Sequence, residues 1–291
     1  MGDCKSAFYS SYIAIVKYDR QGKPQIKRVE AFCSLRNGQI PNPNETFKGI
    51  LDRLDAAVRA ECPDVTQGAL SNCHGDWYEW IVDCVAWNFR LTSNKQSTAL
   101  LLPNVSRFDV ATLYTSNLYE YIDDLRQKVL DVAGVQLITS NPDFVVIIPD
   151  EATLDDSFDI PISEFTEATI NKLQESYKHF IGGCSFNSIA AYLSVKTSFR
   201  PDRRLQISHE GSLMKATYIH LQTREWIIDP EGLKYYAAAS KVGNADREAL
   251  KTVATHSITN VQSLPQAAVD EVFEINTIEQ AHAAFNEIFA E

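Results

Sequence analysis

SVKTSFRPDRRLQISHEGSLMKATYIHLQTR, residues 194–224, is the stretch around which this 291-residue chain is organised. Lys196 closes an apolar run, an arginine-rich segment follows, and Glu210 then begins a helical pattern. The stretch holds six cations and two anions, namely Lys196, Arg200, Arg203, Arg204, Lys215 and Arg224 against Asp202 and Glu210. Because about thirty residues make one supersecondary unit, we expect chemistry and recognition to lie close together here.

The chain as a whole is acidic, with a formal net charge of −11. This balance argues against nucleic-acid binding, because neutralising phosphates requires Lys and Arg. The local excess of cations in residues 194–224 fits a focused DNA-facing cleft, but it fits an ordinary network of ion pairs equally well. Charge alone therefore leaves both interpretations open.

Several classes of protein are disfavoured by composition. No apolar run reaches the length of about eighteen residues that a transmembrane helix needs. The N-terminus lacks the basic segment, apolar core and cleavage site of a secretory signal. The cysteines form no C-x-x-C pair, so we expect reduced thiols and no zinc site. We therefore expect no membrane association and a cytoplasmic location.

Hydrophobic periodicity and turn residues predict helices interleaved with strands, hence an α/β or α+β fold. We expect a hairpin or irregular arm over residues 1–40 and one catalytic core over residues 41–291. Asp76 is a candidate N-cap for a helix over residues 75–90, with Glu79 beside its aromatic stripe. Other predicted helices cover residues 47–62, 108–133, 166–180, 210–224, 244–253 and the tail from 278. Predicted strands cover residues 99–102, 135–139, 144–148 and 255–261, with a hairpin formed by 226–228 and 234–239; residues 189–195 fit either a strand or the end of a helix.

Three separated features suggest hydrolysis of a phosphodiester. Asp143 follows Pro142, Lys196 lies two residues after Ser194, and Glu210 comes fourteen positions later. Carboxylate oxygens can hold Mg²⁺, which activates water, and a lysine can stabilise charge in the transition state. The pattern is a variant of P-D…(D/E)-x-K in which Ser194 replaces the usual acid, so Glu210 is the candidate replacement. An Asp in a turn and a solvated surface Glu79 are the alternative interpretations.

An arginine-rich loop follows the lysine directly. Arginine pairs with guanine O6 and N7, and aspartate can accept a hydrogen bond from cytosine N4. Arg200, Asp202 and Arg203 therefore have the chemistry to read G·C pairs. The alternative is a surface loop with internal ion pairs, which contribute little to stability.

The sequence resembles the CCGG-core family of type II restriction endonucleases, especially members that cut R/CCGGY. The resemblance rests on CHGDWYEW (73–80), LLPNVSRFDV (101–110), LITSNPDF (137–144), residues 194–226, YYAAASKVGNAD (235–246) and LKTVATHSITNVQSLPQAAVDEVFEIN (250–276). It implies a restriction-endonuclease-like core, a mixed sheet flanked by helices. It also implies an active site formed by Asp143, Lys196, Glu210, Glu79 and Ser194, in which Asp143 and Glu210 hold the metal.

The resemblance further implies that Arg200, Asp202 and Arg203 contact the CCGG core of double-stranded DNA. Trp226 and Asn260 match positions at the dimer–dimer contact of tetrameric members. Enzymes of this kind are homotetramers that need Mg²⁺, leave four-base 5′ overhangs and act beside a cognate DNA methyltransferase in the prokaryotic cytoplasm. The main alternative is a sequence-specific DNA-binding protein without cleavage activity, and a different metal-binding or small-molecule enzyme is a more distant one.

Overall fold

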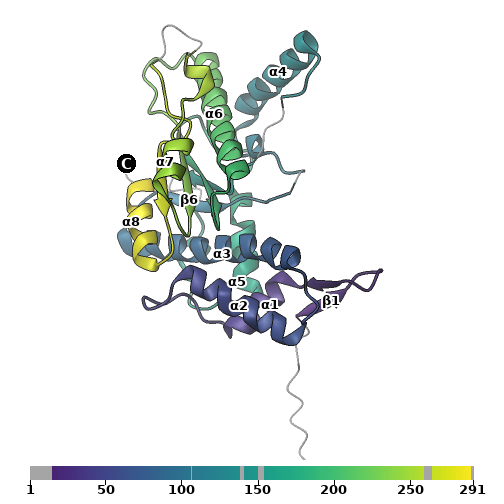
Figure 1. Cartoon of the computed structure of the whole chain (residues 1–291). Coiled ribbons are helices and arrows are strands. Elements are labelled where there is room, and N and C mark those ends of the chain that lie inside the picture. Colours follow the sequence, from purple (N-terminus) through teal and green to yellow (C-terminus); the bar gives the residue numbers. More distant parts are fainter. Residues whose placement is uncertain (1–14, 106, 138–140, 150–153, 259–263, 290–291) are drawn as a thin grey trace, which may run out of the picture.

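The computed structural model describes residues 15–289 apart from 106, 138–140, 150–153 and 259–263. Its centre is a five-stranded sheet in the order β3-β4-β5-β6-β7. The pairs β3–β4 and β4–β5 are antiparallel, whereas β5–β6 and β6–β7 are parallel. Helices lie on both sides of this sheet (Figure 1). The predicted mixed sheet flanked by helices is therefore confirmed.

Helices and strands alternate along most of the described chain. The strands are β1 (Val16–Tyr18), β2 (Pro24–Ile26), β3 (Thr98–Leu101), β4 (Phe144–Ile147), β5 (Ile189–Lys196), β6 (Lys234–Ala239) and β7 (Glu271–Glu274). The α-helices are α1 (Arg28–Arg36), α2 (Phe47–Glu61), α3 (Gln67–Ser93), α4 (Ser116–Ala133), α5 (Glu167–Glu175), α6 (Pro201–Arg224), α7 (Asn244–Leu250) and α8 (Ile278–Ile288). Short 3₁₀ turns are η1 (Val110–Leu113), η2 (Asp156–Asp159), η3 (Ser176–Phe180) and η4 (Thr255–Ile258). Among the described residues no helix has the length and hydropathy to cross a bilayer.

Strand β5, helix α6 and strand β6 form a parallel crossover. Pro201 takes the first helical position of α6, where its missing N–H costs nothing because that group has no partner in the helix. The helix therefore begins nine residues before the start predicted at Glu210. The prediction of a hairpin between residues 226–228 and 234–239 is wrong, because β6 pairs with β5 instead. A parallel pair needs a long crossover, and α6 supplies it.

Helix α3 is the central element of the fold. It contacts β3, β5, α2, α5 and α8, and apolar residues surround it, so the helix has no solvent-facing side along its middle. It begins after Thr66, whose side chain accepts a hydrogen bond from the Ala69 N–H. Asp76 lies inside this helix and is not its N-cap, contrary to prediction.

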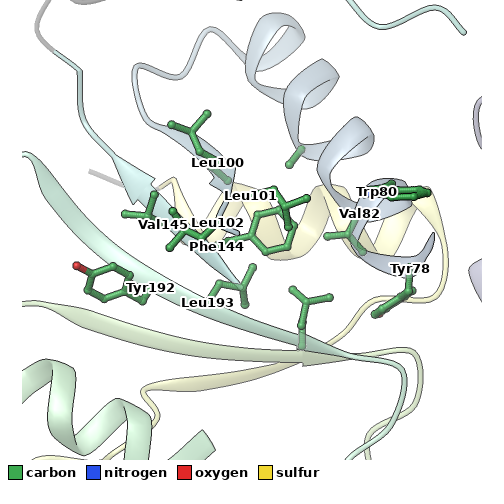
Figure 2. Close-up of a cluster of buried hydrophobic side chains, with 14 of the residues drawn as sticks. Tyr78, Trp80, Val82, Leu100, Leu101, Leu102, Phe144, Val145, Tyr192 and Leu193 are labelled. Carbon is green, nitrogen blue, oxygen red and sulfur yellow. The ribbon is translucent and has the colours of Figure 1, made fainter. Parts of the chain in front are cut away.

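The core between α3 and the sheet follows the pleat of the strands. In Figure 2, Leu101, Phe144 and Leu193 lie toward Val82 of α3, while Tyr192 lies on the other side. Leu101 pairs with Phe144 and Phe144 pairs with Leu193, so one row of paired residues faces α3. The next row faces the opposite side, because side chains alternate along a strand. Asp143 and Ser194 belong to this second set.

The remaining differences lie outside the central crossover. The N-terminal region contains the β1–β2 hairpin and also α1, which packs on α2, α3 and α5. The strand predicted at 135–139 is absent from its described part, residues 135–137. The strand predicted at 255–261 is the 3₁₀ turn η4 in its described part, residues 255–258, and β7 was not predicted.

Candidate active site

Asp143 is fixed by three consecutive residues at the end of β5. Its Oδ2 accepts hydrogen bonds from the Ser194 hydroxyl at 3.1 Å and the Val195 backbone N–H at 2.7 Å. The Lys196 ammonium donates to Oδ1 at 2.7 Å and to Oδ2 at 2.6 Å. Ser194 and Lys196 reach the same carboxylate because they are two residues apart on one strand. The carboxylate is buried and its orientation is therefore set by the sheet.

Lys196 is a protonated cation in this arrangement. Burial acts to lower the pKa of its ammonium, but attraction to Asp143, and then to Glu79, outweighs burial and raises the pKa. A lysine held in this way is a donor and a positive charge, since it has no proton-accepting lone pair when charged. It can therefore stabilise negative charge rather than act as a base.

Glu79 reaches the same site from α3. Burial and the neighbouring Asp143 carboxylate raise its pKa well above the usual range, while Lys196 acts in the opposite direction. Glu79 lines a cavity of about 250 Å³ together with Arg28, Asp76, Trp80 and residues 101–105. Arg28 forms an ion pair with Asp76 at this cavity. The alternative of a solvated surface glutamate is wrong, because Glu79 is buried.

Glu210 approaches from α6 on the side of the sheet that carries Ser194. Its Oε1 accepts a hydrogen bond from the Gln206 amide at 2.8 Å, and its Oε2 accepts one from the Tyr235 hydroxyl at 2.9 Å. Attraction to Glu210 also contributes to the raised pKa of Lys196. Glu210 lies well inside α6, so the crossover helix carries it back over the end of β5.

The carboxylates suit a metal that takes part of its coordination from elsewhere. Among the described residues no group of three or more His, Cys, Asp or Glu side chains is placed to hold a metal ion. Mg²⁺ is usually bound by one or two carboxylates together with substrate phosphates and water. Asp143 and Glu210, two hard oxygen donors beside a cation, fit that requirement.

The predicted recognition loop is in fact the first turn of α6. Arg200 precedes Pro201 as the N-cap, and its guanidinium lies 3.3 Å from the Asp202 carboxylate. Arg203 donates to the Gln206 side chain at 3.0 Å. Arg200 and Asp202 are exposed, and the positive end of the helix dipole adds to the attraction of Arg200 for phosphate. The turn thus presents the residues predicted to read bases on a helix rather than on a loop.

Trp226 and Asn260 are the two residues expected at an oligomer contact. Trp226 follows the end of α6, is 88% exposed and has a φ of 56°. An aromatic residue with positive φ is rare and strained. Ile228 and Leu264 are also almost fully exposed. Asn260 lies outside the described residues.

The structure brings together Asp143, Ser194, Lys196 and Glu79, with Glu210 acting on Lys196 from α6. Sequence reasoning did not identify Tyr235 or Gln206, which hold Glu210. Gln206 precedes Glu210 by four residues, a spacing that places both on one helix face and could have indicated the contact. No local signal marks Tyr235, because it reaches Glu210 of α6 from β6, an element distant in sequence.

The comparisons with known proteins agree over most of the chain. A family model described as Cfr10I/Bse634I restriction endonuclease matches residues 14–291. The type II restriction enzyme Cfr10I of Citrobacter freundii is 48% identical over 251 residues, which cover 85% of this chain and 87% of that protein.

Two solved structures extend this similarity to the fold. The Bse634I restriction endonuclease superposes with a TM-score of 0.87 at 33% identity, covering 97% of this chain and 99% of that one. The type IIF restriction endonuclease Bse634I with cognate DNA also superposes with a TM-score of 0.87 at 33% identity. This match covers 95% of this chain and 98% of that one.

Proposed function

Because this chain belongs to the Cfr10I/Bse634I restriction endonuclease family and is a type II restriction endonuclease, we propose that it cuts double-stranded DNA at R/CCGGY. It cleaves each strand before the first cytosine, needs Mg²⁺ and leaves four-base 5′ overhangs. The observation that carries this proposal is Asp143 held by Ser194 and Lys196 beside Glu79 and Glu210. Family membership decides against the alternative of a DNA-binding protein that does not cut.

The proposed mechanism assigns a role to each of these side chains. Asp143 and Glu210 would hold Mg²⁺, which when bound would supply Lewis-acid activation of the phosphate and of a water molecule. Lys196 stabilises the charge that develops on the phosphoryl oxygens, because its raised pKa keeps it cationic. Ser194 orients Asp143. Burial and the neighbouring Asp143 raise the pKa of Glu79 well above its usual range, which favours its protonated form, and in that form Glu79 can donate a proton within the cavity.

The first turn of α6 is the proposed reader of the CCGG core. Arg200 and Arg203 donate to guanine O6 and N7, and Asp202 accepts from cytosine N4. These groups already contact one another or Gln206, so they exchange those contacts for base edges on binding. Arg204 is not assigned this role, because its side chain is only 24% exposed and pairs with Asp246 of α7, whereas the Arg200 side chain is 64% exposed.

The proposed active form is a homotetramer, a dimer of dimers. A two-fold dimer matches the symmetry of a palindromic site. Trp226 supports a second interface, because an exposed, strained aromatic beside exposed Ile228 is a typical contact residue. We assign Asn260 to the same interface. The cell must protect its own sites, so we propose a cognate DNA methyltransferase as the functional partner in a prokaryotic cytoplasm.

The test is cleavage of plasmids that carry one site each. Plasmids with ACCGGT, GCCGGC or TCCGGA are incubated with the protein and Mg²⁺, and the cut ends are sequenced. We expect cleavage of the first two and four-base 5′-CCGG ends, because TCCGGA keeps the core but reverses the outer purine and pyrimidine. Equal cutting of all three plasmids would show that the protein does not read the outer base pair. Cuts at random positions would overturn the proposal.

A further inference from the structure

Tyr235 lies beneath the active site on β6. Its side chain is fully buried, and its Cα pairs with that of Tyr192 in the parallel β5–β6 ladder. Its hydroxyl donates its single proton to Glu210 Oε2 at 2.9 Å and lies next to the Ser194 side chain. Ser194 in turn donates to Asp143. Tyr235 therefore connects the carboxylate on α6 with the carboxylate at the start of β4.

The protein backbone makes room for this contact at Gly211. A Cβ at this position would overlap the carbonyl oxygen of Ala268 and would lie 3.0 Å from the Tyr235 ring. The residue after Glu210 must therefore be very small if α6 is to lie against β6. The close approach places the Tyr235 hydroxyl within reach of Glu210.

The two partners of Glu210 differ in rigidity. Gln206 is exposed on α6 and also accepts a hydrogen bond from Arg203, a residue proposed to turn toward DNA. Tyr235 is enclosed by the core and has only two rotatable side-chain bonds. Tyr235 is thus a permanent donor, whereas the contact with Gln206 can be exchanged.

We propose that Tyr235 is the positioning residue of Glu210 and holds its carboxylate in place for a divalent metal. The inference rests on the proposed function, because it assigns Glu210 to the metal. Removing a partner of a metal ligand typically lowers metal affinity or activity about 10- to 100-fold. Tyr235→Phe keeps the ring against Gly211 and removes only the hydroxyl.

Tyr192→Phe is the matched control. Tyr192 is equally buried and lies beside Tyr235 on the same face of the sheet. Its hydroxyl contacts Tyr114 rather than an active-site residue. Both substitutions therefore remove one buried hydroxyl contact from neighbouring strands, and only one of them removes a contact to Glu210.

The first measurement is the single-turnover cleavage rate of a cognate duplex as a function of Mg²⁺ concentration. We expect Tyr235→Phe to need about 10- to 100-fold more Mg²⁺ for its half-maximal rate, with unchanged affinity for the duplex. Tyr192→Phe should follow the wild-type curve. Superimposed curves for Tyr235→Phe and wild type, or equal shifts in both variants, would overturn the inference.

The second measurement does not depend on cleavage. Mn²⁺ is titrated into each protein bound to the duplex in a Lys196→Ala background, and free Mn²⁺ is followed by electron paramagnetic resonance. We expect Tyr235→Phe to bind Mn²⁺ more weakly than the Lys196→Ala parent, with an affinity that approaches the affinity of Glu210→Gln. Tyr192→Phe should bind Mn²⁺ as the parent does. If wild-type protein cut no DNA at any metal concentration, the proposed function would fail; cleavage with an unaltered metal requirement in Tyr235→Phe would reject the role of Tyr235 alone.

Discussion

Asp143 receives its hydrogen bonds from a backbone N–H, a hydroxyl and an ammonium, three donors of very different mobility. The Val195 N–H is part of the strand, so it fixes Asp143 whatever the side chains do. Lys196 balances the charge of Asp143 and also acts on Glu79. Removing the lysine would leave two carboxylates facing each other in a buried site, and like charges at such a distance disfavour ionisation of both.

Lys196→Ala tests the assignment of the catalytic cation. We expect the single-turnover rate to fall at least about 100-fold, because a positive charge directed at the reacting phosphate is lost. Binding of a cognate duplex should remain measurable, since the proposed base contacts come from α6. Lys48→Ala, at an exposed ion pair with Asp52 on α2, is the control. Cleavage by Lys196→Ala at the wild-type rate would remove Lys196 from the mechanism.

Asp83 has a different role, because it lies one helical turn beyond Glu79 in the core. Neither of its side-chain oxygens has a hydrogen-bond partner within the described chain, and burial raises its pKa well above the usual range. In the unfolded chain the carboxyl ionises near pH 4, while in the folded chain it keeps its proton. Stability must therefore decrease as pH rises from about 4 toward the raised pKa.

Asp83→Asn should remove this contribution to the pH dependence. We expect its stability relative to wild type to increase between pH 5 and pH 8, because only the wild type has an unfolded state that gains from losing the Asp83 proton. The raised pKa of Glu79 also makes stability fall as pH rises. Because Glu79 is present in both proteins, it does not affect the difference in stability between Asp83→Asn and wild type. Urea unfolding at several pH values measures this, and parallel profiles would contradict it.

At the level of elements, α6 connects the proposed DNA-reading residues with the central sheet. Its first turn carries Arg200, Asp202 and Arg203, and its middle carries Glu210. Gly211 lets the helix approach Tyr235 and Ala268 more closely than any side chain would allow. The proposed base-reading turn and the proposed metal ligand are therefore parts of one helix, and displacement of the helix would affect both.

Gly211→Ala should destabilise the protein by about 1–3 kcal/mol, because the added Cβ meets a backbone carbonyl that cannot rotate away. Gly75→Ala in α3 is the matched substitution, since nothing lies within 4 Å of its added Cβ. It should stabilise the helix by roughly 0.5–1 kcal/mol. Denaturant midpoints measure both changes in stability. Equal effects of the two substitutions would show that the close contact at Gly211 does not restrict the size of the residue there.

For the molecule as a whole, two surfaces of different chemistry lie at opposite ends of α6. The helix begins at the proposed base-reading turn and ends beside Trp226, which is highly exposed, as is Ile228. In the proposed function the acidic chain binds DNA through the first surface, where Arg200, Arg203 and Arg204 lie within five residues. The second surface is apolar and suits association with another copy of the chain.

Trp226→Ala should shift a homotetramer toward dimers, because it removes a large apolar group from the proposed dimer–dimer contact. Sedimentation velocity at several protein concentrations measures the change. Tyr18→Ala provides the control, since Tyr18 is a large exposed aromatic on the β1–β2 hairpin. If the variant and wild type sediment alike, Trp226 does not belong to that interface.

The sequence by itself determined most elements and several of the chemical groups. Apolar periodicity and turn residues located α2, β3, α5 and α8, because they report local backbone geometry. The two-residue spacing of Ser194 and Lys196 places both on one face if the segment is a strand, and in the structure both contact Asp143. The local excess of cations identified the base-reading region as a candidate, although its helical form was missed.

Tertiary structure alone decided which distant residues meet. A hairpin was predicted around residues 226–239. In the structure β6 instead pairs in parallel with β5, because this pairing buries both strands within one sheet. That choice places Tyr235 beneath Glu210, and α3 brings Glu79 to Asp143. Local sequence sets the period of each element, but strand order and register follow from burying the whole core at once. The active site is formed by that shared burial.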